Sequence, residues 1–142
     1  MTSERVELID DEGELSPAFA LALTSIFLRF SSQAKSIYAE KGFKNLDEFV
    51  HAKEKDESLS KLIITEDELD TFTKQVNEGK KMSKEEKDEV REYFDVDKDG
   101  NLTLTGFLEM YHLQSGGEAE ETWKDLRALG FDDQLKEKEE KS

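Results

Sequence analysis

The chain has 142 residues, of which 35% are hydrophobic, including nine Phe and one Trp, so it can form one domain with a buried core. The chain has 35 Asp and Glu but only 20 Lys and Arg, which gives a formal net charge of -15. This charge argues against nucleic-acid partners and favours cations or basic partners. The absence of cysteine excludes disulfides, thiolate zinc sites and cysteine nucleophiles. The acidic start and the short apolar run 18–30 predict neither a secretory signal nor a membrane span, so we expect a soluble, cytoplasmic monomer.

Two segments open the chain. Residues 1–15 are acidic without a sustained apolar period, which predicts a flexible arm. Ser16 and Pro17 then suit the cap and first position of a helix that we expect to end near Ser31. Its apolar residues recur at intervals of three and four and predict a central core helix: Phe19, Leu23, Ile26, Phe27 and Phe30.

Residues 32–63 lack that regular pattern and predict an insertion with one small helix, from Asn45 to Lys55. Its aromatic residues are Tyr38, Phe43 and Phe49. Such spacing is typical of side chains that pin an insertion to its own core, and a partner surface is the alternative.

Capping boxes predict the starts of two further helices. Thr65 pairs with Glu68 in the first, and Leu69, Phe72 and Val76 supply its buried face. Ser83 pairs with Glu86 in the second, where Val90, Tyr93 and Phe94 are expected to face inward.

The second of these helices leads into residues 95–106, which have the spacing of a calcium-binding loop in an EF-hand, a helix–loop–helix unit. Gly100 stands at the sharp turn, loop position six. The oxygen donors at positions one, three, five, seven and nine are Asp95, Asp97, Asp99, the Asn101 carbonyl and Thr103. We expect weak calcium binding, in the range of about 10⁻⁴ to 10⁻³ M, with magnesium possible.

Gly106 occupies loop position twelve, where a bidentate carboxylate normally provides two oxygens and one charge. Glu109, three residues later, either contributes through water or is a surface carboxylate. If the remaining geometry is that of a working loop, Gly106→Glu should tighten calcium binding. A silent loop is the alternative.

An internal repeat aligns residues 64–69 with 102–107, with an aliphatic residue and then Thr at loop positions eight and nine. It predicts a degenerate first hand, 16–79, and a second hand, 83–115, with Ile64 opposite Leu102 in a short antiparallel pair. The alternative is that Thr65 is merely a helix cap.

After a Gly-Gly loop, residues 118–130 predict a helix whose Trp123 and Leu126 fill the groove between the two hands. This completes one all-α domain, 16–135, followed by a charged flexible tail, 136–142.

The segment 94–135 resembles the hidden EF-hand and ligand-mimic helix of the mitochondrial Rho (Miro) GTPases. The matching residues are 102–108, Glu121-Thr122-Trp123, Leu126-Arg127 and Gly130-Phe131-Asp132-Asp133. The resemblance implies a hand that has lost calcium binding and a helix docked in its own groove. No phosphate-binding loop is present, so no nucleotide role carries over.

An enzymatic function is not expected, because His51 and His112 stand alone and Asp95-x-Asp97 follows a charged helix rather than a buried strand. We expect an EF-hand-type regulatory or adaptor module with an unidentified protein partner. The alternative is a metal-independent interaction scaffold that uses a surface such as the insertion.

Overall fold

The computed structural model describes residues 5–137, and over that range the chain is predominantly helical with one two-stranded sheet, as an all-α fold class predicts. The elements in chain order are α1 (Pro17–Phe30), α2 (Ser32–Glu40), α3 (Leu46–Lys55), α4 (Glu57–Ser60), β1 (Ile63–Ile64), α5 (Glu66–Val76), α6 (Lys84–Tyr93), β2 (Leu102–Thr103), α7 (Leu104–Gly117) and α8 (Ala119–Ala128).

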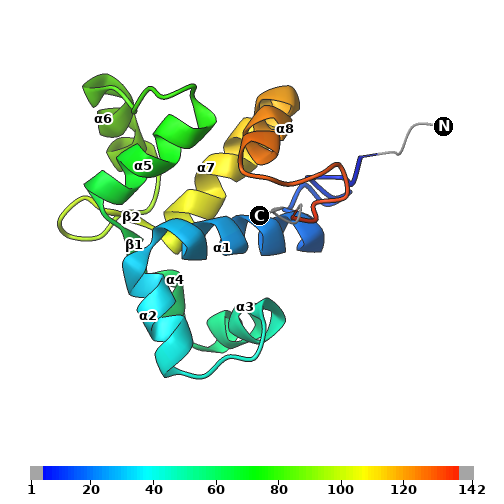
Figure 1. Cartoon of the computed structure of the whole chain (residues 1–142), viewed down its shortest axis with the longest axis vertical. Coiled ribbons are helices and arrows are strands. Elements are labelled where there is room, and N and C mark those ends of the chain that lie inside the picture. Colours follow the sequence, from blue (N-terminus) through cyan, green and yellow to red (C-terminus); the bar gives the residue numbers. More distant parts are fainter. Residues whose placement is uncertain (1–4, 138–142) are drawn as a thin grey trace, which may run out of the picture.

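Helix α1 is the central element, with α2–α4 on one side and α5–α8 on the other (Figure 1). Ser16 caps its first turn by accepting a hydrogen bond from the Phe19 N–H, and Pro17 occupies the first helical position, as expected. Phe19, Leu23 and Ile26 are each 0% exposed. The prediction of a core helix is therefore confirmed.

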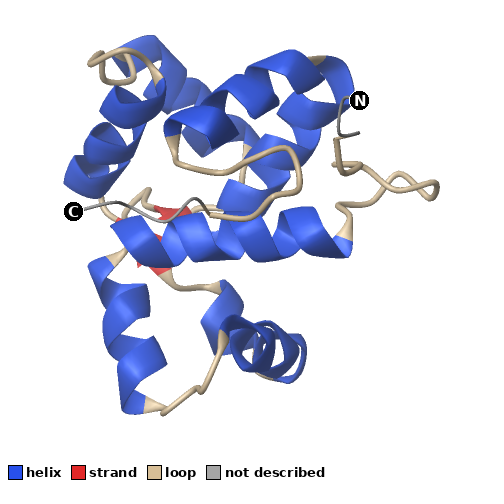
Figure 2. Ribbon diagram, turned by 45° about the vertical axis from the view of Figure 1, so that its right-hand side comes forward, coloured by secondary structure: helices blue, strands red, loops and turns tan. Residues whose placement is uncertain are grey.

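The short sheet lies beside α1 (Figure 2). Strands β1 and β2 are antiparallel, with Ile63 opposite Thr103 and Ile64 opposite Leu102, which confirms the predicted pairing. Ile64 and Leu102 are both buried, so the pair joins α5 and α7 through the core as well as through backbone hydrogen bonds.

The insertion contains three helices, so the prediction of a single one was wrong. Helix α3 was expected, whereas α2 and α4 were not. Ser31 ends α1 and also caps α2, because its hydroxyl accepts from the Ala34 N–H at 3.0 Å and donates to the Ile63 carbonyl at 2.7 Å. The serine-rich run that looked like a break in the helix is thus a cap that starts another one.

The aromatic residues of the insertion pack on one another. Phe49 is 0% exposed, and its ring centroid lies 5.8 Å from that of Tyr38 and 5.4 Å from that of Phe43. Because α3 also packs against α1, the three rings attach the insertion to the main core, as predicted.

Helix α8 packs on α7 and α5 (Figure 1), with Trp123 4% and Leu126 1% exposed. The described part of the expected acidic arm also lies against the helices. Leu8 is 6% exposed, and the Arg5 guanidinium lies 5.1 Å from the Trp123 ring centroid. Residues 1–4 of that arm and 138–142 of the expected tail lie outside the described range.

The last described residues form a second contact with the arm. The Val6 N–H donates to the Asp133 carbonyl at 3.0 Å. Within the C-terminal segment itself, Phe131 forms a bridge with Glu137. Within residues 5–137, no helix has the length and apolar character needed to cross a membrane.

Candidate functional site

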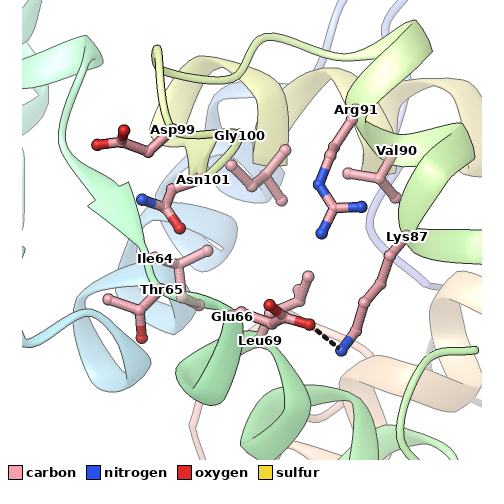
Figure 3. Close-up of a pocket in the computed structure, with 11 residues that line it drawn as sticks. Ile64, Thr65, Glu66, Leu69, Lys87, Val90, Arg91, Asp99, Gly100 and Asn101 are labelled. Atoms are coloured by element: carbon pink, nitrogen blue, oxygen red, sulfur yellow. Dashed lines mark hydrogen bonds and ion pairs between the residues drawn. The ribbon is translucent and has the colours of Figure 1, made fainter. Parts of the chain in front are cut away.

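Helix α6 leads into the loop 95–106 (Figure 3 shows one side of it). Both predicted capping boxes, at α5 and α6, are present. Val90 is 8% exposed and faces the core, but Tyr93 is 68% exposed, which corrects the expectation that it faces inward. Tyr93 is the last residue of α6, where the chain turns away into the loop and leaves the ring uncovered.

The Asp95 carboxylate has two protein donors. Thr103 Oγ1 donates to Asp95 Oδ2 at 2.6 Å, and Lys61 Nζ lies 3.1 Å from the same oxygen. The Thr103 hydrogen bond, followed by the Lys61 ammonium, lowers the pKa of the Asp95 carboxyl. The carboxylate at loop position one is therefore ionised at neutral pH and has a cation of its own chain beside it.

The Asp97 carboxylate organises the turn. Its Oδ1 accepts hydrogen bonds from the N–H groups of Asn101 and Asp99, both at 2.9 Å, and the Asn101 N–H is the main cause of its lowered pKa. In return, the Asp97 N–H donates to the Asn101 carbonyl at 2.9 Å. The carbonyl expected at loop position seven thus already accepts a hydrogen bond inside the loop.

Four of the five predicted metal ligands are brought together in two pairs, Asp95 with Thr103 and Asp97 with Asn101. Asp99 does not join them, since its side chain is exposed and points away from the neighbouring cavity (Figure 3). Within the described residues, no group of three or more His, Asp or Glu side chains is placed to hold a metal ion.

Gly106 is buried where the loop closes on itself. A Cβ atom at this position would overlap the Asp95 carbonyl oxygen and lie 2.7 Å from Leu102 Cδ1. The backbone of the first loop residue therefore fills the space beside position twelve. The condition attached to the Gly106→Glu prediction, a working loop geometry, is therefore not met by this closed form, because the loop must first open to admit any side chain.

Glu109 has a structural contact that the sequence did not reveal. Its Oε1 accepts a hydrogen bond from the Asp95 N–H at 3.0 Å, which ties α7 to the start of the loop. Glu68, which the internal repeat aligns with Gly106, accepts from the Thr65 N–H at 3.0 Å and from the Ser32 hydroxyl at 2.7 Å. Both carboxylates act here as hydrogen-bond acceptors that join backbone segments.

On the α6 side, a cavity of about 50 Å³ separates the loop from α5 (Figure 3). Lys87 Nζ lies 2.8 Å from Glu66 Oε2 and 2.9 Å from Asp70 Oδ1, with a side chain only 10% exposed. These two carboxylates, Glu66 first, raise the pKa of Lys87. Arg91 covers Gly100, whose φ of 84° suits glycine.

Sequence reasoning missed Lys61 and Lys87. Lys87 could have been found, because it stands three residues before Val90 on the buried face of α6, where an unpaired charge would be costly. No comparable local pattern marks Lys61, whose partner Asp95 is 34 residues away.

Comparison with known proteins finds no matching family model, no matching curated protein and no matching solved structure.

Proposed function

We propose that the chain is a non-enzymatic adaptor module, built as an EF-hand-like pair with α8 in its own groove, whose second loop keeps its closed form without a metal ion. The main observation behind this proposal is that the Asp95 carbonyl oxygen occupies the space where a side chain at loop position twelve, Gly106, would begin. A calcium ion at full coordination needs six to eight oxygens, and the loop directs several of its oxygens to protein donors instead.

The pairing of Ile64 with Leu102 and the burial of Trp123 support the EF-hand-like description. The Lys61 ammonium, next to Asp95 Oδ2, supplies positive charge where a cation would otherwise lie. His51 is exposed with its Nδ1 3.8 Å from Glu54 Oε2, and His112 Nε2 lies 2.7 Å from the Gly13 carbonyl oxygen, so the contacts of both histidines are accounted for by structural partners.

The second candidate is a weak calcium or magnesium site on Asp95, Asp97, Asp99, Asn101 and Thr103. The lowered pKa values of Asp95 and Asp97 favour it, because both carboxylates stay charged at neutral pH. A divalent ion that bound there would have to displace Lys61 from Asp95.

Thermal unfolding separates the two candidates. A site with a Kd of about 10⁻⁴ to 10⁻³ M would stabilise the fold by about 1.4 to 2.7 kcal/mol at roughly 10 mM calcium. That corresponds to a rise in Tm of about 3 to 10 °C for a domain of this size. We expect the Tm in calcium to equal that in EDTA when NaCl matches the ionic strength, since screening alone stabilises an acidic chain.

A Lys61→Gln variant sharpens the test, because it removes the competing ammonium and keeps most of the side-chain length. Under our proposal the Tm of the unmodified chain does not respond to calcium beyond the NaCl control. A rise in Tm of 3 °C or more with calcium for the unmodified chain overturns the proposal in favour of the weak site. A rise in the variant alone assigns Lys61 as the group that excludes the metal, in agreement with the proposal.

A further inference from the structure

A cleft of about 270 Å³ lies between α5, α7, α8 and the start of α6, on a different part of the molecule from the loop 95–106. Apolar and aromatic side chains form much of its wall: Phe72, Val76, Met82, Met110 and Tyr111. Phe72 and Tyr111 are buried, whereas Val76 and both methionines are partly exposed. The methionines are flexible and polarisable, so this wall can adapt to an aliphatic chain.

The charged residues that line the cleft are mainly acidic. Glu86, Glu121 and Asp125 contribute carboxylates, and Lys124 is the single basic residue among the lining residues. The chain as a whole carries a formal charge of -15, so the wider field has the same sign.

Asp125 is the most enclosed of the three carboxylates. Its Oδ2 accepts from the Tyr111 hydroxyl at 2.8 Å and from Gln114 Nε2 at 3.4 Å, which fixes the group against α7. Burial raises the pKa of Asp125. A cation next to this carboxylate would offset the cost of keeping it charged away from water.

We infer that this cleft binds a basic side chain of a partner peptide, with the aliphatic stem on Met82 and Met110 and the cationic head at Asp125. Arginine fits best, because its planar guanidinium presents several donors in a fixed geometry to carboxylates on the two sides. An acidic side chain would be repelled, and a purely apolar one would remove water from Asp125 and leave Lys124 as the only basic residue of the lining near it. The inference rests on the proposed adaptor function and specifies that the partner presents a basic side chain.

The full chain, labelled with ¹³C at the methionine methyl groups, provides the test. The probe is the peptide Ac-Leu-Arg-Leu-NH₂, and its control is Ac-Leu-citrulline-Leu-NH₂, which has nearly the same shape but no charge. We expect saturable shifts of the Met82 and Met110 methyl signals with the arginine peptide and none with the citrulline peptide. Equal shifts with both peptides, or no shift of the Met82 and Met110 signals with the arginine peptide, would overturn the inference.

Matched variants test which carboxylates of the cleft bind the arginine peptide. Asp125→Asn keeps an acceptor for Tyr111 but removes the charge, and we expect affinity to fall about tenfold or more. Glu121→Gln should weaken binding by a smaller factor. Because Glu121 is exposed, this variant does not alter a buried group. Glu89→Gln makes the same charge change on α6 outside the cleft and should leave affinity within about twofold.

Unchanged affinity in both Asp125→Asn and Glu121→Gln would sink the inference. That failure is distinguishable from failure of the proposed metal-independent loop, because the latter is measured by the calcium dependence of the Tm without any peptide.

Discussion

Gly106→Ala adds one methyl group at a point where the chain leaves no room for it. The new Cβ would overlap the Asp95 carbonyl oxygen and lie 2.7 Å from Leu102 Cδ1. The first of these is a backbone atom, which cannot rotate away as the end of a flexible side chain could. The loop must therefore shift as a whole, or α7 must begin later.

The expected cost follows from three contributions. Helix propensity favours alanine over glycine by up to about 1 kcal/mol within a helix. Overpacking costs about 1 to 3 kcal/mol. The Asp95 carbonyl also accepts from the Thr103 N–H at 3.1 Å, and losing this bond costs about 1 kcal/mol. We expect a net loss of about 1 to 4 kcal/mol in the free energy of unfolding.

Urea unfolding followed by helical circular dichroism measures this loss, with the unmodified chain and Gly116→Ala as references. Gly116 lies in the same helix and has no atom within 4 Å of a Cβ, so that variant should be neutral or gain up to about 1 kcal/mol. If Gly106→Ala is as stable as Gly116→Ala, the closed form of the loop is not that of the folded protein, and the steric argument against a side chain at position twelve fails.

Three further changes test other parts of the fold. Ser31→Ala removes the hydroxyl that bonds the Ile63 carbonyl and caps α2, and should cost about 1 to 2 kcal/mol in urea unfolding; a change below about 0.5 kcal/mol would contradict this role. Trp123→Ala should cost about 3 to 5 kcal/mol, because the ring is 4% exposed, and an unchanged Tm would show that α8 does not stabilise the core. The pKa of Asp125 is raised by burial, so its contribution to stability is complete below about pH 4 and is lost as pH rises through the folded pKa. Asp125→Asn does not titrate and should therefore gain stability relative to the unmodified chain between pH 4 and pH 7.5, and a difference that stays constant with pH would refute this.

Sequence patterns predicted the elements whose signals are local. The capping boxes at Thr65 and Ser83 involve residues three positions apart, and both form as expected. The Ile64–Leu102 pair is remote in sequence, but the internal repeat placed the two residues at equivalent loop positions. Helix α2 was missed because Ser31 resembles a break, and its second role depends on the Ile63 carbonyl, which is 32 residues away.

The sequence predicted which residues form the loop, but not which partners their oxygen atoms have. The spacing of the aspartates identified the turn correctly, since Asp97 bonds the N–H groups of Asp99 and Asn101. Whether those oxygens remain free for a cation depends on Lys61 and on the approach of the backbone to Gly106. Both are tertiary contacts that no motif of twelve residues contains.

The hydrogen bond between Ser31 and the Ile63 carbonyl joins the two ends of the segment 32–62. The segment is thus an insertion between α1 and β1 whose two ends lie close together, and we call it the branch. The entropic free-energy cost of closing a flexible loop grows only slowly with its length, by about 0.6 kcal/mol per doubling. The same closing contact is therefore compatible with inserted segments of different lengths. The architecture thus allows the branch to change its outer surface independently of the helices that carry the loop and the cleft.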